Sequence, residues 1–299
     1  MIKDYIIEIF EPTLLFGFLS SFVGLSAAIY LKVVNFYLGI LAIIGVIIVQ
    51  ITVNLIDDYV DYKIGIDKET VKTKFSGGSA LVVGNSVTTK GILAVAVVAL
   101  IIAAVIGIYI LGFLSAGIAT IIFLIMMFGF VATVFYARYL THVPFFAEPF
   151  VVLSFAIVGL AVFLVAQNSV VNAYPLLLFA CLPAGLQVGV AMIANELPDK
   201  KVDKKYGRRN MVIMLSHKKM ASKLYVVFQV IAIGLILIGI ATRFLPITFL
   251  ITLIVLPLYY KVWRGISNYK NPKNHEKTMG LNALSALLLE LLISIAFLI

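Results

Sequence analysis

The stretch NLIDDYVDYKIGID, residues 54–67, ends a long apolar run and opens a charged loop. A second stretch, NELPDKKVDKKYGRRN at residues 195–210, does the same later in the chain. Aligned on Asn54 and Asn195, each has an Asp after three residues, a second Asp three or four residues further on, and then a Gly. Because residues three or four apart lie one turn apart on a helix, each stretch brings carboxylates close enough to share a cation.

Carboxylates that share a helix face repel one another unless positive charge lies between them. At a helix C-terminus they also oppose the helix dipole, at a cost of about 0.3–1 kcal/mol each. Mg²⁺ typically couples one or two carboxylates to a substrate phosphate. We therefore predict a diphosphate held through Mg²⁺ between the two clusters, although any single carboxylate alone fits a solvated helix-end charge equally well. The predicted metal ligands are Asn54, Asp57, Asp58, Asp61, Asp67, Asn195, Asp199 and Asp203, with Asp58, Asp61, Asp199 and Asp203 as the catalytic set.

The composition predicts a membrane protein. The 299 residues are 63% hydrophobic and only 12% charged, with a mean hydropathy of +1.12. Apolar runs near 20 residues long recur, and each can cross a hydrocarbon core of about 30 Å as a helix. The short alternating segments of a β-barrel are absent from the sequence. We therefore expect an all-α polytopic fold embedded in the lipid bilayer.

Nine apolar runs are expected to span the membrane around a central cavity, within one domain over 1–299. The acidic clusters end the second and sixth of these runs, which lie four apart. This spacing predicts a four-helix unit used twice, about 13–136 and 148–263, with a ninth helix added. The expected spans are 13–34, 36–58, 91–111, 113–136, 148–167, 174–196, 220–241, 246–263 and 280–299.

The net charge of +9 does not indicate nucleic-acid binding, because the basic residues gather in alternate loops. All of them except Lys32 and Arg243 fall on one side of the expected topology. Such an excess marks the cytoplasmic face, so the N-terminus and both acidic clusters are predicted to be cytoplasmic. The single cysteine, Cys181, lies in an apolar run, which rules out an internal disulfide.

The two stretches resemble the motifs of the UbiA superfamily of intramembrane prenyltransferases. That family has Asn-Asp-x-x-Asp-x-x-x-Asp after its second helix and Asp-x-x-x-Asp after its sixth, and the resemblance covers nearly the whole chain. Asp58 and Asp61 match the first motif, and Asp199 and Asp203 match the second. At the other positions of the first motif, Asp57 replaces the family's Asn and Gly65 its last Asp, with Asp67 two residues later.

These departures resemble the branch that prenylates 1,4-dihydroxy-2-naphthoate in menaquinone synthesis. The segment FSGGS at 75–79, Phe135-Tyr136 with Pro144 and Glu148 downstream, and NELPD at 195–199 are similar to that branch. Two features differ from it. Ala80 stands where an Arg often follows the Gly-Gly-Ser, and the usual Pro-Pro after the Phe-Tyr pair is absent.

The resemblance implies Mg²⁺-dependent transfer of an isoprenyl chain from a polyprenyl diphosphate, such as geranylgeranyl diphosphate, to a small lipophilic or aromatic acceptor. Metal and cations would neutralise the leaving diphosphate, and aromatic faces would attract the resulting allylic cation. The acceptor carbon then attacks and forms a C–C bond. The cations expected near the phosphates are Lys74, Arg138, Arg208 and Arg209.

Several side chains have two interpretations. Tyr136 and Tyr139 fit either phosphate binding or an interfacial aromatic belt, and Arg138 fits either phosphate binding or an orienting anchor. Glu148 begins the fifth span, where it would cap the helix or, as the family branch suggests, bind the acceptor. Glu290 lies deep in the last span, where a charge is costly. The three histidines, His142, His217 and His275, have no metal-ligand spacing and are expected to be loop residues.

Three alternative functions remain open on the sequence. Within prenyl transfer, geranylgeranylglyceryl phosphate of ether-lipid synthesis is the second acceptor considered. A transporter of a metal- or phosphate-containing solute also uses paired repeats and intramembrane acids, but its sites lie near the bilayer midplane. A phosphatidyl-type alcohol transferase would carry one helix-borne acidic run with Asp-Gly and Ala-Arg elements, which is not found here.

Overall fold

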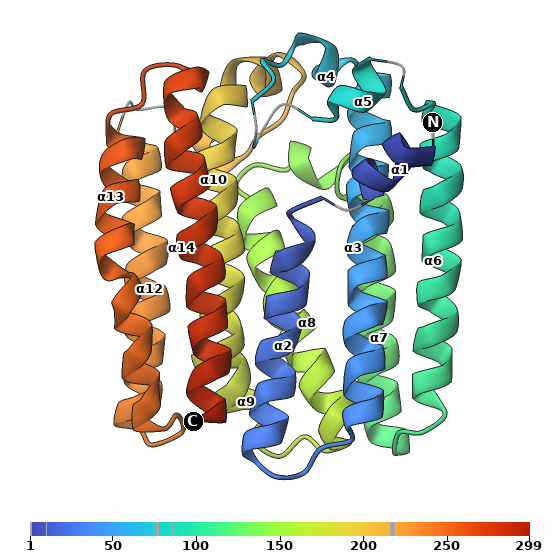
Figure 1. The fold of residues 1–299 in the computed structure, drawn as a ribbon, viewed down its shortest axis with the longest axis vertical. Coiled ribbons are helices and arrows are strands. Elements are labelled where there is room, and N and C mark those ends of the chain that lie inside the picture. Colours follow the sequence, from blue (N-terminus) through green and yellow to red (C-terminus); the bar gives the residue numbers. More distant parts are fainter. Residues whose placement is uncertain (1, 10, 74, 76–77, 85, 216–218) are drawn as a thin grey trace.

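The computed structural model describes residues 2–9, 11–73, 75, 78–84, 86–215 and 219–299, and these contain helices and no strand. The long helices stand side by side as one bundle, and the short helices α1 (Ile2–Ile9), α4 (Ile66–Glu69) and α5 (Ala80–Val83) lie at the end that carries the N-terminus (Figure 1). Two further short helices, η1 (Leu140–His142) and α11 (Met211–Met214), interrupt later connections.

Eight helical segments of the described chain are long and apolar enough to cross a membrane. A further apolar helix, α2 (Leu14–Tyr30), is shorter, with 17 residues. The chain is therefore an integral membrane protein, while the expected count of nine spans stays a prediction. The eight segments are α3 (Phe36–Ile64), α6 (Thr89–Leu111), α7 (Ala116–Phe135), α8 (Ala147–Gln167), Ala173–Lys205 formed by α9 (Ala173–Leu176), η2 (Leu177–Cys181) and α10 (Leu182–Lys205), α12 (Met220–Ala241), Ile247–Ser267 formed by η3 (Ile247–Val255) and α13 (Leu256–Ser267), and α14 (Pro272–Leu298).

Helices α3, α10 and α14 extend furthest beyond their expected spans, because their polar ends continue the helix. Helix α3 runs through its acidic cluster and stops at Gly65, whose φ of 101° favours glycine. Helix α10 likewise continues past its cluster, and Gly207 follows it with φ 85°. Helix α14 begins eight residues early, at Pro272, because the Asn271 side chain accepts a hydrogen bond from the Asn274 N–H at 3.0 Å.

Helix α10 lies at the centre of the bundle, where it packs against α8, α12 and α14. In the most apolar 18 residues of the segment Ala173–Lys205, 72% of the residues are buried, whereas the corresponding shares are 22% in α6 and 17% in α7. Helices α6 and α7 therefore contribute much less to the interior of the bundle than α10 does. Glu290 of α14 is fully buried and accepts a hydrogen bond from the Ser20 hydroxyl at 3.1 Å, so this carboxyl faces the bundle.

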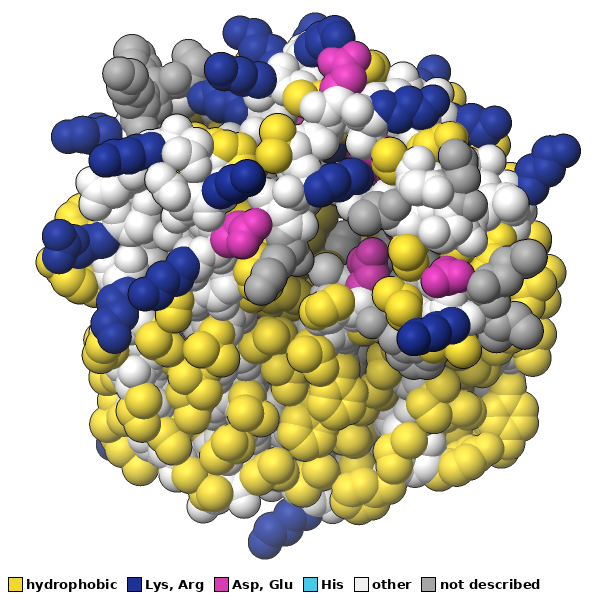
Figure 2. Space-filling view, turned by 45° about the horizontal axis from the view of Figure 1, so that its top comes forward, with side chains coloured by type: hydrophobic (Ala, Val, Ile, Leu, Met, Phe, Trp, Pro, Cys, Tyr) yellow, Lys and Arg dark blue, Asp and Glu magenta, His cyan; other side chains and the backbone are white. Residues whose placement is uncertain are grey.

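The two ends of the bundle differ in charge. Figure 2 shows lysine and arginine side chains gathered around the end with the short helices, above a belt of hydrophobic side chains. Lys32 and Arg243, the two basic residues expected on the other side, follow α2 and α12. Those two helices end at the opposite end of the bundle (Figure 1), so the charge asymmetry of the sequence is present in the structure.

Helices α2 and α8 approach each other closely through glycines. A Cβ on Gly24 would overlap the Gly159 carbonyl oxygen, and a Cβ on Gly159 would lie 2.8 Å from the Ser20 carbonyl oxygen. Small residues at such crossings permit backbone contact between membrane helices. This contact positions α2 against α8, the helix whose first turn lies at the polar end of the bundle.

Gly24→Ala is expected to lower the unfolding temperature in detergent, with a loss of about 1–3 kcal/mol, because the added methyl group overpacks the α2–α8 contact. Gly129→Ala on α7 is the matched control, since a Cβ there meets nothing within 4 Å. Its unfolding temperature should be unchanged or slightly raised. Equal effects of the two substitutions would contradict the proposed close packing.

Candidate active site

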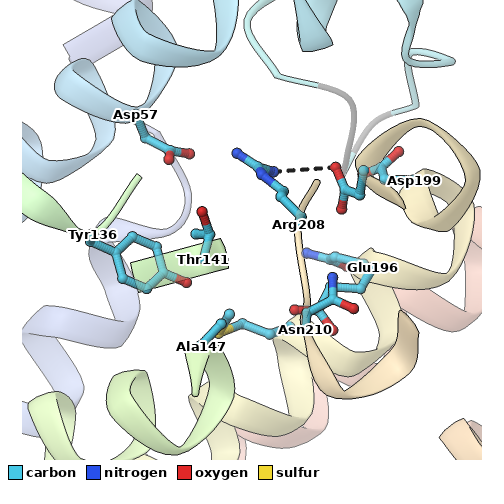
Figure 3. Close-up of a pocket in the computed structure, with 11 residues that line it drawn as sticks. Asp57, Tyr136, Thr141, Ala147, Glu196, Asp199, Arg208 and Asn210 are labelled. Carbon is cyan, nitrogen blue, oxygen red and sulfur yellow. Dashed lines mark hydrogen bonds and ion pairs between the residues drawn. The ribbon is translucent and has the colours of Figure 1, made fainter. Parts of the chain in front are cut away.

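A cavity of about 210 Å³ lies between the polar ends of α3 and α10. Figure 3 shows Asp57 on one side, Asp199 on the other, and Arg208 between them. The cavity therefore lies where the two acidic clusters of the sequence meet. Its lining residues are Asp57, Tyr136, Thr141, Ala147, Met192, Asn195, Glu196, Asp199, Asp203, Arg208 and Asn210.

The residues of the first cluster have different partners. Asp57 lines the cavity, and Asp61, one turn further on, is ion-paired with Arg208. Asn54 lies elsewhere, because its Nδ2 donates to the Thr13 hydroxyl at 2.8 Å and to Glu11 Oε2 at 3.1 Å. Asp58, on the same face as Asn54, is buried. The carboxylates of α3 that approach the second cluster are thus Asp57 and Asp61.

The second cluster is presented by the last three turns of α10. Asn195, Asp199 and Asp203 all line the cavity, as their spacing of four residues predicts. Glu196 lines it too, next to Asn195, and was not among the predicted site residues. Glu196 belongs to the second sequence stretch, so its position in that motif could have predicted that it lies in the site.

Arg208 joins the two clusters. Its guanidinium is ion-paired with Asp61 of α3 and, at 3.3 Å, with Asp203 Oδ1 of α10. Burial favours the neutral form of the side chain, but the charges of Asp61, Asp57 and Asp203 outweigh it and raise the pKa of Arg208 above its ordinary value. The guanidinium therefore stays charged and holds together two carboxylates that are far apart in sequence.

The connection after α10 fixes the position of this arginine. Gly207 adopts φ 85°, and the Arg208 N–H then bonds the Asp203 carbonyl at 3.0 Å. The next residue ties the same connection to the loop after α7, since the Arg209 N–H donates to the Thr141 carbonyl at 2.9 Å. That loop also supplies Tyr136 to the cavity. Burial, together with the negative charges of Asp57 and Glu196, raises the pKa of Tyr136, so its phenol stays protonated and can donate.

Glu148 lies behind the cavity, on the first turn of α8. It is fully buried, and its Oε1 accepts a hydrogen bond from the Met211 N–H at 2.6 Å. Glu148 and Glu196 also interact with each other. The second oxygen of each carboxyl is buried and has no hydrogen-bond partner in the described part of the chain. This pair connects the cavity lining to the start of α8.

An exposed ion pair links the two polar connections above the cavity. Lys205 Nζ lies 2.6 Å from Glu69 Oε2, and the Tyr206 hydroxyl donates to Glu69 Oε1 at 2.8 Å. Hydrogen bonds from Lys205 and Tyr206 lower the pKa of Glu69. On the inner side of the same connection, Asp67 is buried against the backbone of Gly78. The loop after α3 is therefore fastened to the end of α10.

The remaining predicted phosphate-binding residues lie further out. Arg138, Tyr139 and Arg209 are exposed, and the Tyr139 ring packs against Phe135 at 5.7 Å between centroids. Lys74 lies outside the described residues.

Besides Glu196, the sequence did not predict the cavity residues Thr141 and Asn210, which lie in the connections between long helices, where no spacing rule applies. It also missed Lys72, whose positive charge acts on Asp61 and Asp199.

The donor set suits a hard cation, although the described residues contain no group of three or more acidic, histidine or cysteine side chains already arranged around a metal position. Four acidic residues but one basic residue line the cavity. Asp61 Oδ1 and Asp199 Oδ1, one from each cluster, are buried without a hydrogen-bond partner among the described residues. Buried carboxylate oxygens of this kind fit Mg²⁺ whose remaining ligands come from a phosphate or water.

The fold and the cavity together define a class of protein: a helical membrane protein with an acidic polar cavity at one end of its bundle. The model of the UbiA prenyltransferase family matches residues 13–287. The chain therefore belongs to the UbiA prenyltransferase family, and it is a prenyltransferase.

Three known proteins are similar to this chain. The chain is 27% identical over 241 residues to the 1,4-dihydroxy-2-naphthoate octaprenyltransferase of Bacillus subtilis (strain 168), covering 80% of this chain and 75% of that one. Its fold is similar to that of a digeranylgeranylglyceryl phosphate synthase, with TM-score 0.58 and 18% identity over 99% of this chain and 98% of the other. It is also similar to a UbiA homologue from Archaeoglobus fulgidus bound to DMAPP and Mg²⁺, with TM-score 0.53 and 11% identity over 93% and 96%. At these identities the two solved structures support the fold.

Arg208→Met is expected to destabilise the protein by about 3–5 kcal/mol at pH 7, because it leaves buried carboxylates without their counter-charge. The loss should be smaller at pH 5, where protonation removes part of that uncompensated charge. Thermal unfolding in detergent at both pH values measures it. Arg209→Met, at an exposed neighbour, should change little at either pH. A loss for Arg208→Met that does not vary with pH would argue against the ion-pair bridge.

Proposed function

We propose that this protein transfers an isoprenyl chain from an allylic polyprenyl diphosphate to an aromatic quinone precursor, in a reaction that depends on Mg²⁺. The observation that carries the proposal is the cavity in which carboxylates of α3 and α10 meet around Arg208. Carboxylates bind a diphosphate only through a cation, and here they come from the two stretches that resemble the family motifs. The protein with DMAPP and Mg²⁺ bound shares this fold, which is consistent with the proposal.

In this proposal the metal is held by residues of both clusters. Asp57, Asp61, Asp199 and Asp203 are the principal ligands, because they line the cavity or meet at Arg208. Bound Mg²⁺ would bridge carboxylate and phosphate oxygens and neutralise the charge of the leaving diphosphate. The outer members of the proposed set are Asn54, Asp58, Asp67 and Asn195, which fix the metal site or supply a further oxygen.

Arg208 and Tyr136 are the proposed diphosphate contacts inside the cavity. A charged guanidinium can exchange carboxylate oxygens for phosphate oxygens, because both offer the same planar pair of acceptors. The neutral Tyr136 phenol donates to a phosphate oxygen from the other side of the cavity. Arg138, Tyr139, Arg209 and Lys74 are proposed to act at the entrance, where exposed cations attract the incoming diphosphate.

The chemistry follows from this arrangement of charges. The C–O bond to the diphosphate breaks, and the bonding electrons leave with the phosphate oxygen, where positive groups stabilise them. The allylic cation that remains is attacked by an electron-rich ring carbon of the acceptor. A C–C bond forms, and the ring carbon then loses its proton to an oxygen of the released diphosphate, which restores aromaticity.

A dihydroxynaphthoate-like compound is the proposed acceptor. The 27% identity to a naphthoate octaprenyltransferase supports this choice, as does the NELPD segment of the second stretch. Glu148 is proposed to contact the acceptor, since its carboxyl interacts with that of the cavity residue Glu196. Geranylgeranylglyceryl phosphate is the second candidate, because a synthase of that ether-lipid pathway has a similar fold. Transport is not proposed, since the acidic residues lie at helix ends on one side of the bundle.

The proposed topology has nine membrane-spanning helices arranged as two four-helix repeats, 13–136 and 148–263, and a final helix at 280–299. Two features support the repeat: an acidic helix end recurs at α3 and α10, and a positive-φ glycine follows each one. The basic residues around the cavity end support a cytoplasmic position for the N-terminus and the site.

Asp199→Asn is expected to lower prenyl transfer at least about a hundredfold, because an amide supplies no charge to the metal and the leaving diphosphate. Turnover of radiolabelled geranylgeranyl diphosphate by purified protein, with and without Mg²⁺, measures this. Glu276→Gln on α14 is the control for loss of a carboxylate and should keep full activity. Undiminished turnover by Asp199→Asn would remove that residue from the site.

The acceptor is tested by offering the purified protein labelled geranylgeranyl diphosphate with either 1,4-dihydroxy-2-naphthoate or geranylgeranylglyceryl phosphate. We expect product with the naphthoate, and we expect Glu148→Gln to raise the KM for this acceptor more than the KM for the diphosphate. Product with geranylgeranylglyceryl phosphate and none with the naphthoate would show that the second acceptor is the correct one.

A further inference from the structure

Helix α10 contains a proline inside the second acidic cluster, directly before Asp199. Pro198 lies within the helix, between Glu196 and Asp199. A proline has no N–H, so the carbonyl four residues earlier, that of Ala194, loses its helical donor. Ala194 is fully buried, and a buried carbonyl without a donor is unfavourable, above all in a membrane protein.

A side chain from another helix supplies the missing donor. His275 Nε2 lies 3.0 Å from the Ala194 carbonyl oxygen. A carbonyl only accepts, so Nε2 must carry the proton and donate it. His275 is itself 2% exposed and is held by an edge-on contact with Tyr269 at 5.0 Å between ring centroids. The expectation that this histidine lies in a loop was wrong, because α14 starts early enough to include it.

The last two turns of α10 carry Asp199 and Asp203, and their direction depends on how the helix passes Pro198. The ring of a proline pushes against the preceding turn and frees one backbone bond, so it lets the helix bend there. A hydrogen bond from α14 to the freed carbonyl fixes this point of α10 relative to the rest of the bundle.

We infer that His275 is a positioning residue, which replaces the hydrogen bond lost at Pro198 and thereby sets where Asp199 and Asp203 stand in the site. This inference rests on the proposed function only for the role of the two aspartates. The hydrogen bond itself is independent of it.

Helix α14 offers a matched control. Asn282 Nδ2 donates to the Val190 carbonyl of α10 at 2.9 Å, one turn before Ala194. The residue four positions after Val190 is Ala194, which has an N–H, so that carbonyl keeps its helical donor. Asn282 is 1% exposed and equally internal. The two contacts therefore differ in one respect: the Ala194 carbonyl has lost its helical donor to a proline, and the Val190 carbonyl has not.

The first experiment compares unfolding temperatures in detergent. His275→Phe keeps a ring against Tyr269 and removes the donor, so it should lower the unfolding temperature by several degrees. In the Pro198→Ala background the same change should cost much less, because the backbone N–H that this substitution restores can bond the Ala194 carbonyl. Asn282→Leu should lower the unfolding temperature equally in both backgrounds.

If His275→Phe alone yields no folded protein, recovery of folded protein by the added Pro198→Ala substitution supports the inference in the same way. An equal loss in both backgrounds, or no recovery, would overturn the inference.

The second experiment measures binding of geranylgeranyl thiolodiphosphate, a non-reacting donor analogue, in the presence of Mg²⁺. His275→Phe should weaken binding about tenfold, since a small displacement of the aspartates is enough to disturb a shared metal site. His275→Gln, whose amide can donate in place of Nε2–H, should bind within about twofold of the unmodified protein, and so should Asn282→Leu. Unchanged binding by a destabilised His275→Phe protein would reduce His275 to a purely structural residue.

A reference variant separates this inference from the proposed function. Asp199→Asn should abolish binding of the analogue. If the unmodified protein does not bind the analogue either, the proposed function fails, and the positioning role fails with it. The unfolding temperatures still decide in that case whether His275 replaces the donor lost at Pro198.

Discussion

The buried negative charge shared by α3 and α10 is the constraint on which the polar end of this structure depends. Two helices from different halves of the chain direct carboxylates at one small cavity, and such charges are tolerated only when paired. Arg208 provides the pairing by bonding Asp61 and Asp203 at once. One guanidinium cannot balance four acidic lining residues, so the site retains an affinity for further positive charge. A bound Mg²⁺ would meet that requirement and could in turn hold a diphosphate.

The surrounding structure can be understood as support for this arrangement. The glycine after α10 turns the chain so that Arg208 points back into the cavity, and the next residue is hydrogen-bonded to the loop after α7. Above the cavity, Glu69 ties the loop after α3 to Lys205 and Tyr206. Each of these contacts joins a segment of the first half of the chain to one of the second. The site therefore depends on the packing of both halves.

The membrane imposes a second requirement, which explains the hydrogen bond between His275 and the Ala194 carbonyl beside Pro198 of α10. Backbone groups inside a bundle in lipid must find partners within the protein. A proline beside the acidic cluster breaks that rule locally, and His275 of α14 restores it. The same contact connects the last helix to the site. Helix α14 is thus more than an added span that covers the bundle.

The sequence by itself determined the membrane class, the positions of most helices and the two acidic stretches. These follow from local properties: hydropathy over about 20 residues, and carboxylates spaced by one helical turn. Tertiary structure decided which of those carboxylates face the cavity. Asp57 lines the cavity and Asp61 is ion-paired with Arg208, whereas Asn54 bonds Glu11 and Thr13, because the rotation of α3 is set by its packing against neighbouring segments. It also decided the roles of Arg208, Glu196 and His275, whose partners lie on other helices, and no spacing along the chain encodes a contact between distant segments.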